Sequence, residues 1–136
     1  MLGITQEVYW VGDNMYKYFT VDELKCQHCG EEGIDDVFMQ KIESLRETLA
    51  FPFPVTSGYR CPKQPIEARK NAPGANSTGH AVDIGVSGNK AYRLLQAALE
   101  VGLTGIGVNQ KGSSRFIHLD DIENSPSRPR PWIWSY

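Results

Sequence analysis

Apolar residues recur at helical spacing in two stretches of the chain, and each stretch predicts an amphipathic helix. The first helix is predicted over residues 35–49, and the second over residues 89–101, where Gly102 ends it. A third, short helix begins at Thr20, because Thr20 and Glu23 have the spacing of a capping box. The apolar positions that define the two long helices are Phe38, Ile42, Leu45 and Leu49, and Ala91, Leu94, Leu95, Ala98 and Leu99.

Short apolar segments bounded by turn residues predict four strands, at residues 55–58, 80–86, 105–109 and 115–119. A Lys-Gly-Ser-Ser turn separates the last two strands and predicts a hairpin. The elements together indicate an α+β fold, in which a small antiparallel sheet packs against helices. Only a brief helix is expected in the long polar stretch at residues 61–78, and loops of this length are often functional.

The length of the chain predicts a single domain spanning residues 1–136. Its core is expected at about residues 19–121, followed by an extended tail at residues 122–136 that packs over the surface. Three aromatic residues of the tail could line a lip on which a sugar or peptide stacks, but we interpret them as packing contacts. They are Trp132, Trp134 and Tyr136.

Charge and composition exclude several classes of partner. The net charge of -2 and the isoelectric point near 5.9 lack the basic balance of a nucleic-acid-binding protein. No segment reaches the roughly 18 apolar residues of a membrane span, and residues 1–10 lack the basic start and apolar core of a signal peptide. We therefore expect a monomer that is made in a cytoplasm and has neither a nucleic-acid nor a membrane partner.

Three cysteines, an odd number, argue against a framework of disulfide bonds. Cys26 and Cys29 form a C-x-x-C pair around His28, and Cys61 follows much later. These four residues are compatible with a small structural zinc site or a redox site. Because a zinc knuckle usually contains two such pairs, we favour reduced thiols, the first two lying in a turn before Gly30.

Strand alternation sorts the polar residues of the predicted sheet. Along residues 80–86 it places Asp83 on one face and His80 on the other, and along the last strand His118 and Asp120 share a face. If these faces meet, Asp83 and His118 pair a carboxylate with an imidazole, two donors that zinc accepts. Nearby, Asp120 could act as base to a metal-bound water or orient a ligand histidine. The sequence thus predicts a metal site on the sheet face.

Three motifs occur in order along about residues 19–121. They are Ser57-Gly58-Tyr59-Arg60-Cys61-Pro62, Gly79-x-Ala81-x-Asp83-Ile84 and Phe116-x-His118-x-Asp120. Together they resemble the zinc D-Ala-D-Ala carboxypeptidase family and the related phage L-alanyl-D-glutamate endolysins, and small phage-encoded members end like residues 129–136. The resemblance implies that Asp83, His118 and a further histidine hold zinc, and that substrate is bound by Arg60 in the motif that begins at Ser57.

Two positions depart from the family pattern. The first zinc-binding histidine of the pattern falls on Asn76, whose amide oxygen is a poorer zinc ligand than imidazole. His80 is the alternative ligand, although strand alternation points it to the opposite face. Several relatives carry an acidic residue where this chain has Arg115, so Asp120 becomes our candidate for the catalytic base, with Asp121 as a second candidate.

The resemblance implies a zinc-dependent peptidase that cleaves the stem peptides of bacterial peptidoglycan, as a carboxypeptidase or as an endolysin. Arg60 would grip a peptide carboxylate or the oxyanion of the tetrahedral intermediate. Such a protein would reside in the host bacterial cytoplasm or the virion and act at the cell wall when released. The alternative is a degenerate, metal-free member with a peptide-binding or structural role in a phage particle. The other retained site residues favour the enzyme, whereas Asn76 and Arg115 favour the alternative.

Overall fold

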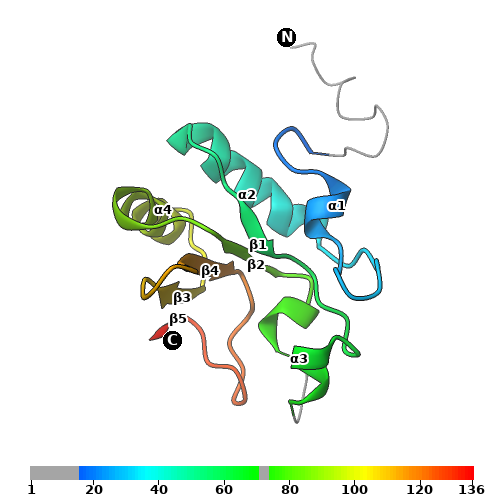
Figure 1. Ribbon diagram of the computed structural model, residues 1–136. Helices are drawn as coiled ribbons and strands as arrows, with labels where there is room; N and C mark the ends of the chain where they lie inside the picture. The colour runs from blue at the N-terminus through cyan, green and yellow to red at the C-terminus, as the bar shows by residue number, and fades with distance from the viewer. Residues whose placement is uncertain (1–15, 71–73) are drawn as a thin grey trace.

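The computed structural model describes residues 16–70 and 74–136, which form helices around a five-stranded sheet (Figure 1). The helical elements are α1 (Val21–Leu24), α2 (Asp36–Leu49), α3 (Pro65–Ala68), the 3-10 helix η2 (Ala75–Ser77) and α4 (Gly88–Glu100). The strands are β1 (Val55–Ser57), β2 (Ala81–Ile84), β3 (Gly105–Asn109), β4 (Phe116–Asp120) and β5 (Trp132–Ser135). In the part of the chain that is described, no helix is long and apolar enough to cross a membrane. The N-terminal segment considered for a signal peptide lies outside that part.

The predicted helices begin where the sequence provides caps. The Thr20 side chain accepts a hydrogen bond from the Glu23 N–H, and the Glu23 carboxylate accepts one from the Thr20 N–H, which confirms the capping box. Asp35 caps α2 by accepting a hydrogen bond from the Phe38 N–H at 2.9 Å. Ala50 ends α2 in the left-handed conformation, with φ of 60°.

The five strands pair in the order β1-β2-β4-β3-β5. The predicted strands pair antiparallel, whereas β5 runs parallel to β3 at the edge of the sheet. The expectation of a tail that only covers the surface therefore missed a strand. Backbone bonds hold β5 in place, such as the one that the Trp132 N–H donates to the Thr104 carbonyl at 2.9 Å. Any residue can make such bonds, so the side-chain pattern gives no sign of them.

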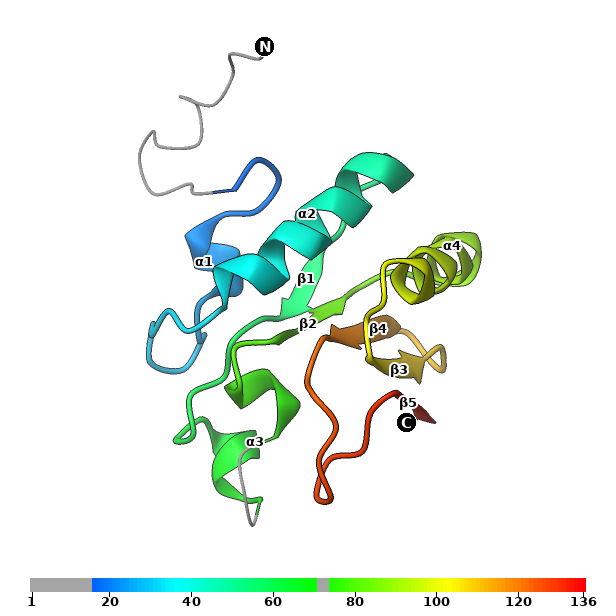
Figure 2. The same cartoon turned by 180° about the vertical axis from the view of Figure 1, so that it is seen from behind.

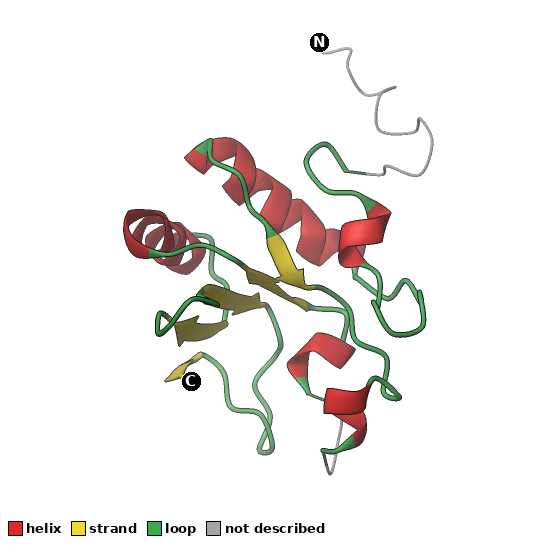
Figure 3. Ribbon diagram, in the orientation of Figure 1, coloured by secondary structure: helices red, strands yellow, loops and turns green. Residues whose placement is uncertain are grey.

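The two faces of the sheet have different surroundings. α2 and α4 lie over one face (Figures 1 and 2), and together they bury the apolar core. The fully buried core side chains include Phe38, Met39, Ile42 and Leu94 from the helices, and Val82, Ile84, Ile106, Ile117 and Leu119 from the strands. Burying each such side chain contributes about 1.5–3 kcal/mol. The connection from β1 to β2, which contains α3 and η2, extends beyond the ends of these strands (Figure 3).

Candidate active site

One row of residues crosses neighbouring strands on the sheet face opposite the core. Asp83 of β2 pairs with His118 of β4. His118 pairs in turn with Gly107 of β3, and Gly107 with Trp134 of β5. At the other end of the row, Ser57 of β1 pairs with Asp83. Side chains directly opposite each other in a sheet lie close enough to interact, so the register meets the condition that the sequence left open: the faces of Asp83 and His118 coincide.

The His118 ring lies between two carboxylates and is only 2% exposed. Its Nδ1 lies 2.8 Å from Asp83 Oδ1, and its Nε2 lies 2.8 Å from Asp120 Oδ2. Burial favours the neutral ring, but the hydrogen bonds with Asp120 and Asp83 outweigh it and raise the pKa of His118. Each ring nitrogen therefore has its own carboxylate partner, and the ring cannot rotate without losing both contacts.

Arg130 compensates the charge of Asp120, which is completely buried. Its Nε donates to Asp120 Oδ1 at 2.9 Å and its Nη2 to Asp120 Oδ2 at 2.7 Å, a two-point contact between guanidinium and carboxylate. Burial acts to raise the pKa of Asp120, but the contacts with His118 and Arg130 outweigh it and lower this pKa to about 2. The carboxylate is thus held ionised, with one oxygen on the Nε2 edge of His118.

Two glycines of strand β3 leave room for the side chains of the site. A Cβ atom at Gly105 would lie 2.2 Å from both carboxylate oxygens of Asp120. A Cβ atom at Gly107 would lie 2.7 Å from Trp134 Nε1. The indole of Trp134 can therefore lie over Gly107 and against the His118 ring, with 5.1 Å between the ring centroids. Two glycines spaced by two in a strand are a sequence signal of such a close approach of other groups to the backbone.

Asn76 occupies the position of the first zinc-binding histidine of the family pattern and is 7% exposed. Its Nδ2 donates hydrogen bonds to the Gly58 carbonyl at 3.1 Å and to Ser57 Oγ at 3.3 Å. Because Ser57 pairs with Asp83, these contacts bring the amide beside the Asp83–His118 pair. Among the described residues, no hydrogen bond reaches Asn76 Oδ1. This oxygen is therefore the atom of the side chain that is available as a metal ligand.

A cleft of about 530 Å³ opens beside Asp83. Its lining brings together Ser57, Asp83 and Arg60 from the predicted site with residues of the β3–β4 hairpin, among them Arg115 and Phe116. An open cleft of this size next to a buried polar cluster is a common setting for a binding site.

Arg60 is held at the cleft by a buried glutamate. Its Nη1 lies 3.3 Å from Glu67 Oε2, and the Glu67 side chain has no exposed surface. The Lys70 ammonium at 3.0 Å and the Gly74 N–H at 2.7 Å also contact the Glu67 carboxylate. The polar loop between β1 and β2 thus positions the guanidinium of Arg60, for which the family resemblance implies substrate binding.

The other two candidates from the sequence are engaged elsewhere. His80 Nδ1 lies 2.9 Å from Asp121 Oδ1, and the His80 ring packs against Phe38 of α2 at 6.4 Å between centroids. Lys41 Nζ contacts the second oxygen of Asp121 at 3.0 Å. His80 and Asp121 therefore pair with each other and with α2, whereas the Asp83–His118 pair lies on the opposite face.

Two further features lie outside the Asp83–His118 pair. The Sγ atoms of Cys26, Cys29 and Cys61 all lie within 4.8 Å of one another.

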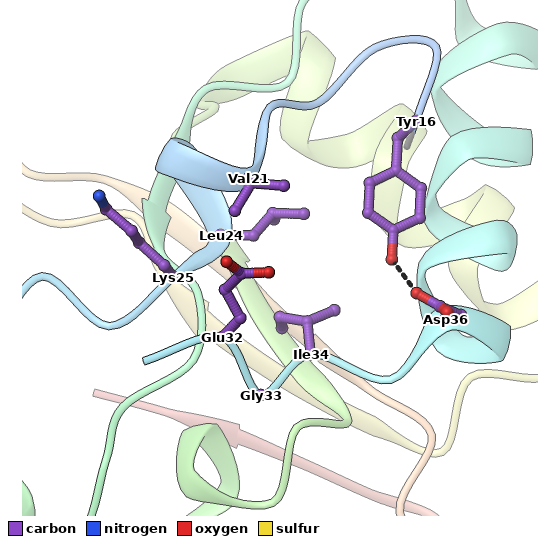
Figure 4. Close-up of a pocket in the computed structure, with 8 residues that line it drawn as sticks. All are labelled: Tyr16, Val21, Leu24, Lys25, Glu32, Gly33, Ile34 and Asp36. Carbon is purple, nitrogen blue, oxygen red and sulfur yellow. Dashed lines mark hydrogen bonds between the residues drawn. The ribbon is translucent and has the colours of Figure 1, made fainter. Parts of the chain in front are cut away.

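A smaller pocket lies between α1 and the start of α2 (Figure 4). Its lining mixes apolar side chains with Lys25 and Glu32 and contains none of the predicted site residues.

The residues that the sequence analysis missed come from the tail. Arg130 was not singled out, and Trp134 and Tyr136 were interpreted as packing contacts. In the structure Tyr136 stacks near Phe116 of the cleft, with 5.1 Å between ring centroids, and Arg130 and Trp134 contact the Asp120–His118 pair. The period-2 spacing of three aromatic residues is a signal that could have indicated a shared strand face.

The buried carboxylate–imidazole–carboxylate arrangement beside an open cleft is typical of a metal-dependent hydrolase. The chain belongs to the peptidase M15 family, whose model matches residues 17–120. Members of this family are zinc-dependent peptidases. The match includes Asp83, His118 and Asp120, whereas Arg130 and Trp134 lie beyond it. No curated protein matches the chain.

Proposed function

We propose that the protein is a zinc-dependent peptidase that cleaves the stem peptides of bacterial peptidoglycan. The observation that carries the proposal is the orientation of His118, with Nδ1 directed at Asp83 and Nε2 held by Asp120. A histidine that donates one N–H to a buried carboxylate presents its other nitrogen as a metal ligand. The membership of the peptidase M15 family supports the same class of reaction.

The donor atoms at the site fit zinc. Asp83 offers a carboxylate oxygen and His118 an imidazole nitrogen, and both are ordinary zinc ligands. The third position falls to the oxygen of Asn76, a weaker donor than imidazole. When bound there, zinc would supply a Lewis acid that polarises the scissile carbonyl and lowers the pKa of a bound water.

The remaining side chains have roles that follow from their contacts. Asp120 is fully buried, and both of its oxygens are engaged by Arg130 and His118, which supports an orienting role rather than proton transfer. Arg60 lies at the cleft beside Ser57, where a guanidinium can bind a peptide carboxylate or stabilise an oxyanion. Glu67 keeps Arg60 in place.

The test is hydrolysis of purified peptidoglycan and of synthetic stem peptides, with products identified by mass spectrometry. Release of D-Ala indicates a carboxypeptidase, and cleavage between L-Ala and D-Glu indicates an endolysin. We expect zinc-dependent cleavage that a chelator stops and that Asp83→Ala and His118→Ala abolish. Asp22→Asn is the matched control, because this carboxylate is exposed and outside the cleft. Absence of cleavage with zinc in excess would overturn the proposal and favour a metal-free binding module.

A further inference from the structure

Three thiols from two distant segments of the chain converge at one place. Cys26 and Cys29 lie in the turn after α1, and Cys61 follows β1. Their Sγ atoms are all within 4.8 Å of one another, and none of the three forms a disulfide. Cys26 and Cys61 are buried, whereas Cys29 is exposed. The sequence offered only one C-x-x-C pair, and the fold supplies the third thiol.

Backbone contacts fix the two segments against each other. The Tyr59 N–H donates to the Leu24 carbonyl at 2.9 Å. A Cβ atom at Gly58 would lie 2.5 Å from the same carbonyl oxygen, so only glycine allows this approach. The Gly30 N–H donates to the Cys26 carbonyl at 2.8 Å and closes the turn that carries the first two thiols. These backbone contacts therefore hold the two cysteine-bearing segments together.

The surroundings of Cys26 suit a thiolate, the form in which cysteine binds metals. Its buried Sγ accepts a hydrogen bond from the Cys61 N–H at 3.3 Å. An amide donor directed at a buried sulfur favours its negative charge, and a bound cation would compensate that charge.

A fourth donor lies beside Cys61. His28 Nδ1 is 3.8 Å from Cys61 Sγ, and the His28 side chain is exposed, so the ring would have to turn toward Cys26 and Cys29 to share a metal ion with them. Zinc–sulfur bonds of about 2.3 Å in a tetrahedron place the sulfurs about 3.8 Å apart. The separations of the three sulfurs, at most 4.8 Å, are therefore within about 1 Å of those that a zinc ion with three cysteine ligands requires.

We propose that Cys26, Cys29, Cys61 and His28 bind a structural zinc ion, separate from the site at Asp83. A disulfide would use two of the thiols and leave the third thiol and the imidazole without a role, whereas zinc uses all four donors. Cys61 directly follows Arg60 in the sequence. This ion would therefore tie the segment that carries Arg60 to the turn after α1.

The experiment measures zinc in the Asp83→Ala variant, in which the site on the sheet face has lost a ligand. We expect about one zinc ion per chain to remain, and none in the double variant Asp83→Ala/Cys26→Ser. In the same background His28→Ala should weaken zinc binding, and His80→Ala is its matched control, because His80 pairs with Asp121 outside the cysteine cluster. Cobalt substitution in Asp83→Ala should add thiolate-to-cobalt charge-transfer absorption. These readouts do not depend on peptidase activity, so they separate the two proposals.

A second measurement covers the case in which Cys26→Ser does not fold. In Asp83→Ala with all cysteines intact, the three thiols should resist alkylation until a chelator is added, and the chelator should lower the melting temperature. Three thiols that react equally fast with and without chelator, or an intramolecular disulfide in the freshly purified protein, would overturn the proposal. Absence of zinc from Asp83→Ala, together with absence of the cobalt–thiolate absorption, would overturn it as well.

Discussion

Replacing Arg130 with methionine tests whether the tail is part of the site. Arg130 is 5% exposed at its side chain, and its guanidinium makes two hydrogen bonds to an Asp120 carboxylate that is not exposed at all. Methionine keeps much of the aliphatic stem that packs in this place but removes the charge. The Asp120 carboxylate would then remain buried with the His118 ring and the Ile122 N–H as its partners.

The size of the effect follows from the burial of this pair. Removing one partner of a buried ion pair typically costs 3–5 kcal/mol, because the other charge is left without compensation. Since His118 still contacts Asp120, we expect the lower end, about 3 kcal/mol of the free energy of unfolding. Arg130→Lys should lose less, because lysine keeps the charge but cannot make the two-point contact. Loss of the support for His118 should also weaken zinc binding about 10- to 100-fold.

Urea denaturation followed by circular dichroism measures the stability, and competition with a zinc chelator of known affinity measures the binding. Arg69→Ala is the control, because this exposed arginine makes one backbone contact and should change stability by less than about 0.5 kcal/mol. A loss below about 1 kcal/mol in Arg130→Met, with zinc affinity unchanged, would show that the Asp120–Arg130 contact does not support the site.

Three further predictions concern the third ligand, the sheet and the loop. Asn76→His should raise zinc affinity and the rate of hydrolysis, and unchanged affinity in calorimetry would show that position 76 does not reach the metal. Gly105→Ala should lower the free energy of unfolding by about 1–3 kcal/mol, because the added Cβ atom would lie 2.2 Å from the Asp120 carboxylate oxygens. An unchanged urea denaturation curve would contradict this prediction. Burial acts to raise the pKa of Glu67, but the Gly74 N–H, Lys70 and Arg60 outweigh it and lower this pKa from the ordinary 4.5. Glu67 therefore stabilises the fold at neutral pH and loses this contribution as the pH falls through its folded-state pKa. The stability difference between wild type and Glu67→Gln should accordingly shrink below about pH 4, and a difference independent of pH would refute the assignment.

Local patterns predicted the helices and the four antiparallel strands because caps and apolar periodicity act over a few residues. The alternation of side chains along each strand separated Asp83 from His80 and grouped His118 with Asp120, and the 2.8 Å contact between Asp83 and His118 shows that these two faces coincide. It further indicated that His80 points away, as its contact with Asp121 shows.

The contacts that sequence reasoning missed join segments far apart in the chain. Cys61 meets Cys26 across 35 residues because the segment after β1 pairs with the end of α1, where the Tyr59 N–H donates to the Leu24 carbonyl. Arg130 reaches Asp120 because β5 pairs with β3 through bonds that carry no side-chain signature. In both cases the path of the backbone decides which side chains meet.

The alternation of polar and apolar side chains along β4 also affects which register the strands adopt during folding. His118 and Asp120 lie on the sheet face opposite the helices, and Ile117 and Leu119 are buried in the apolar core on the other face. If β4 slipped by one residue, an imidazole and a carboxylate would enter the apolar core, and two large aliphatic side chains would take their places beside Asp83. Misaligned sheets would then lack both a stable interior and the ligands of the site, so the residues proposed to hold the metal also help select the one strand alignment in which they can do so.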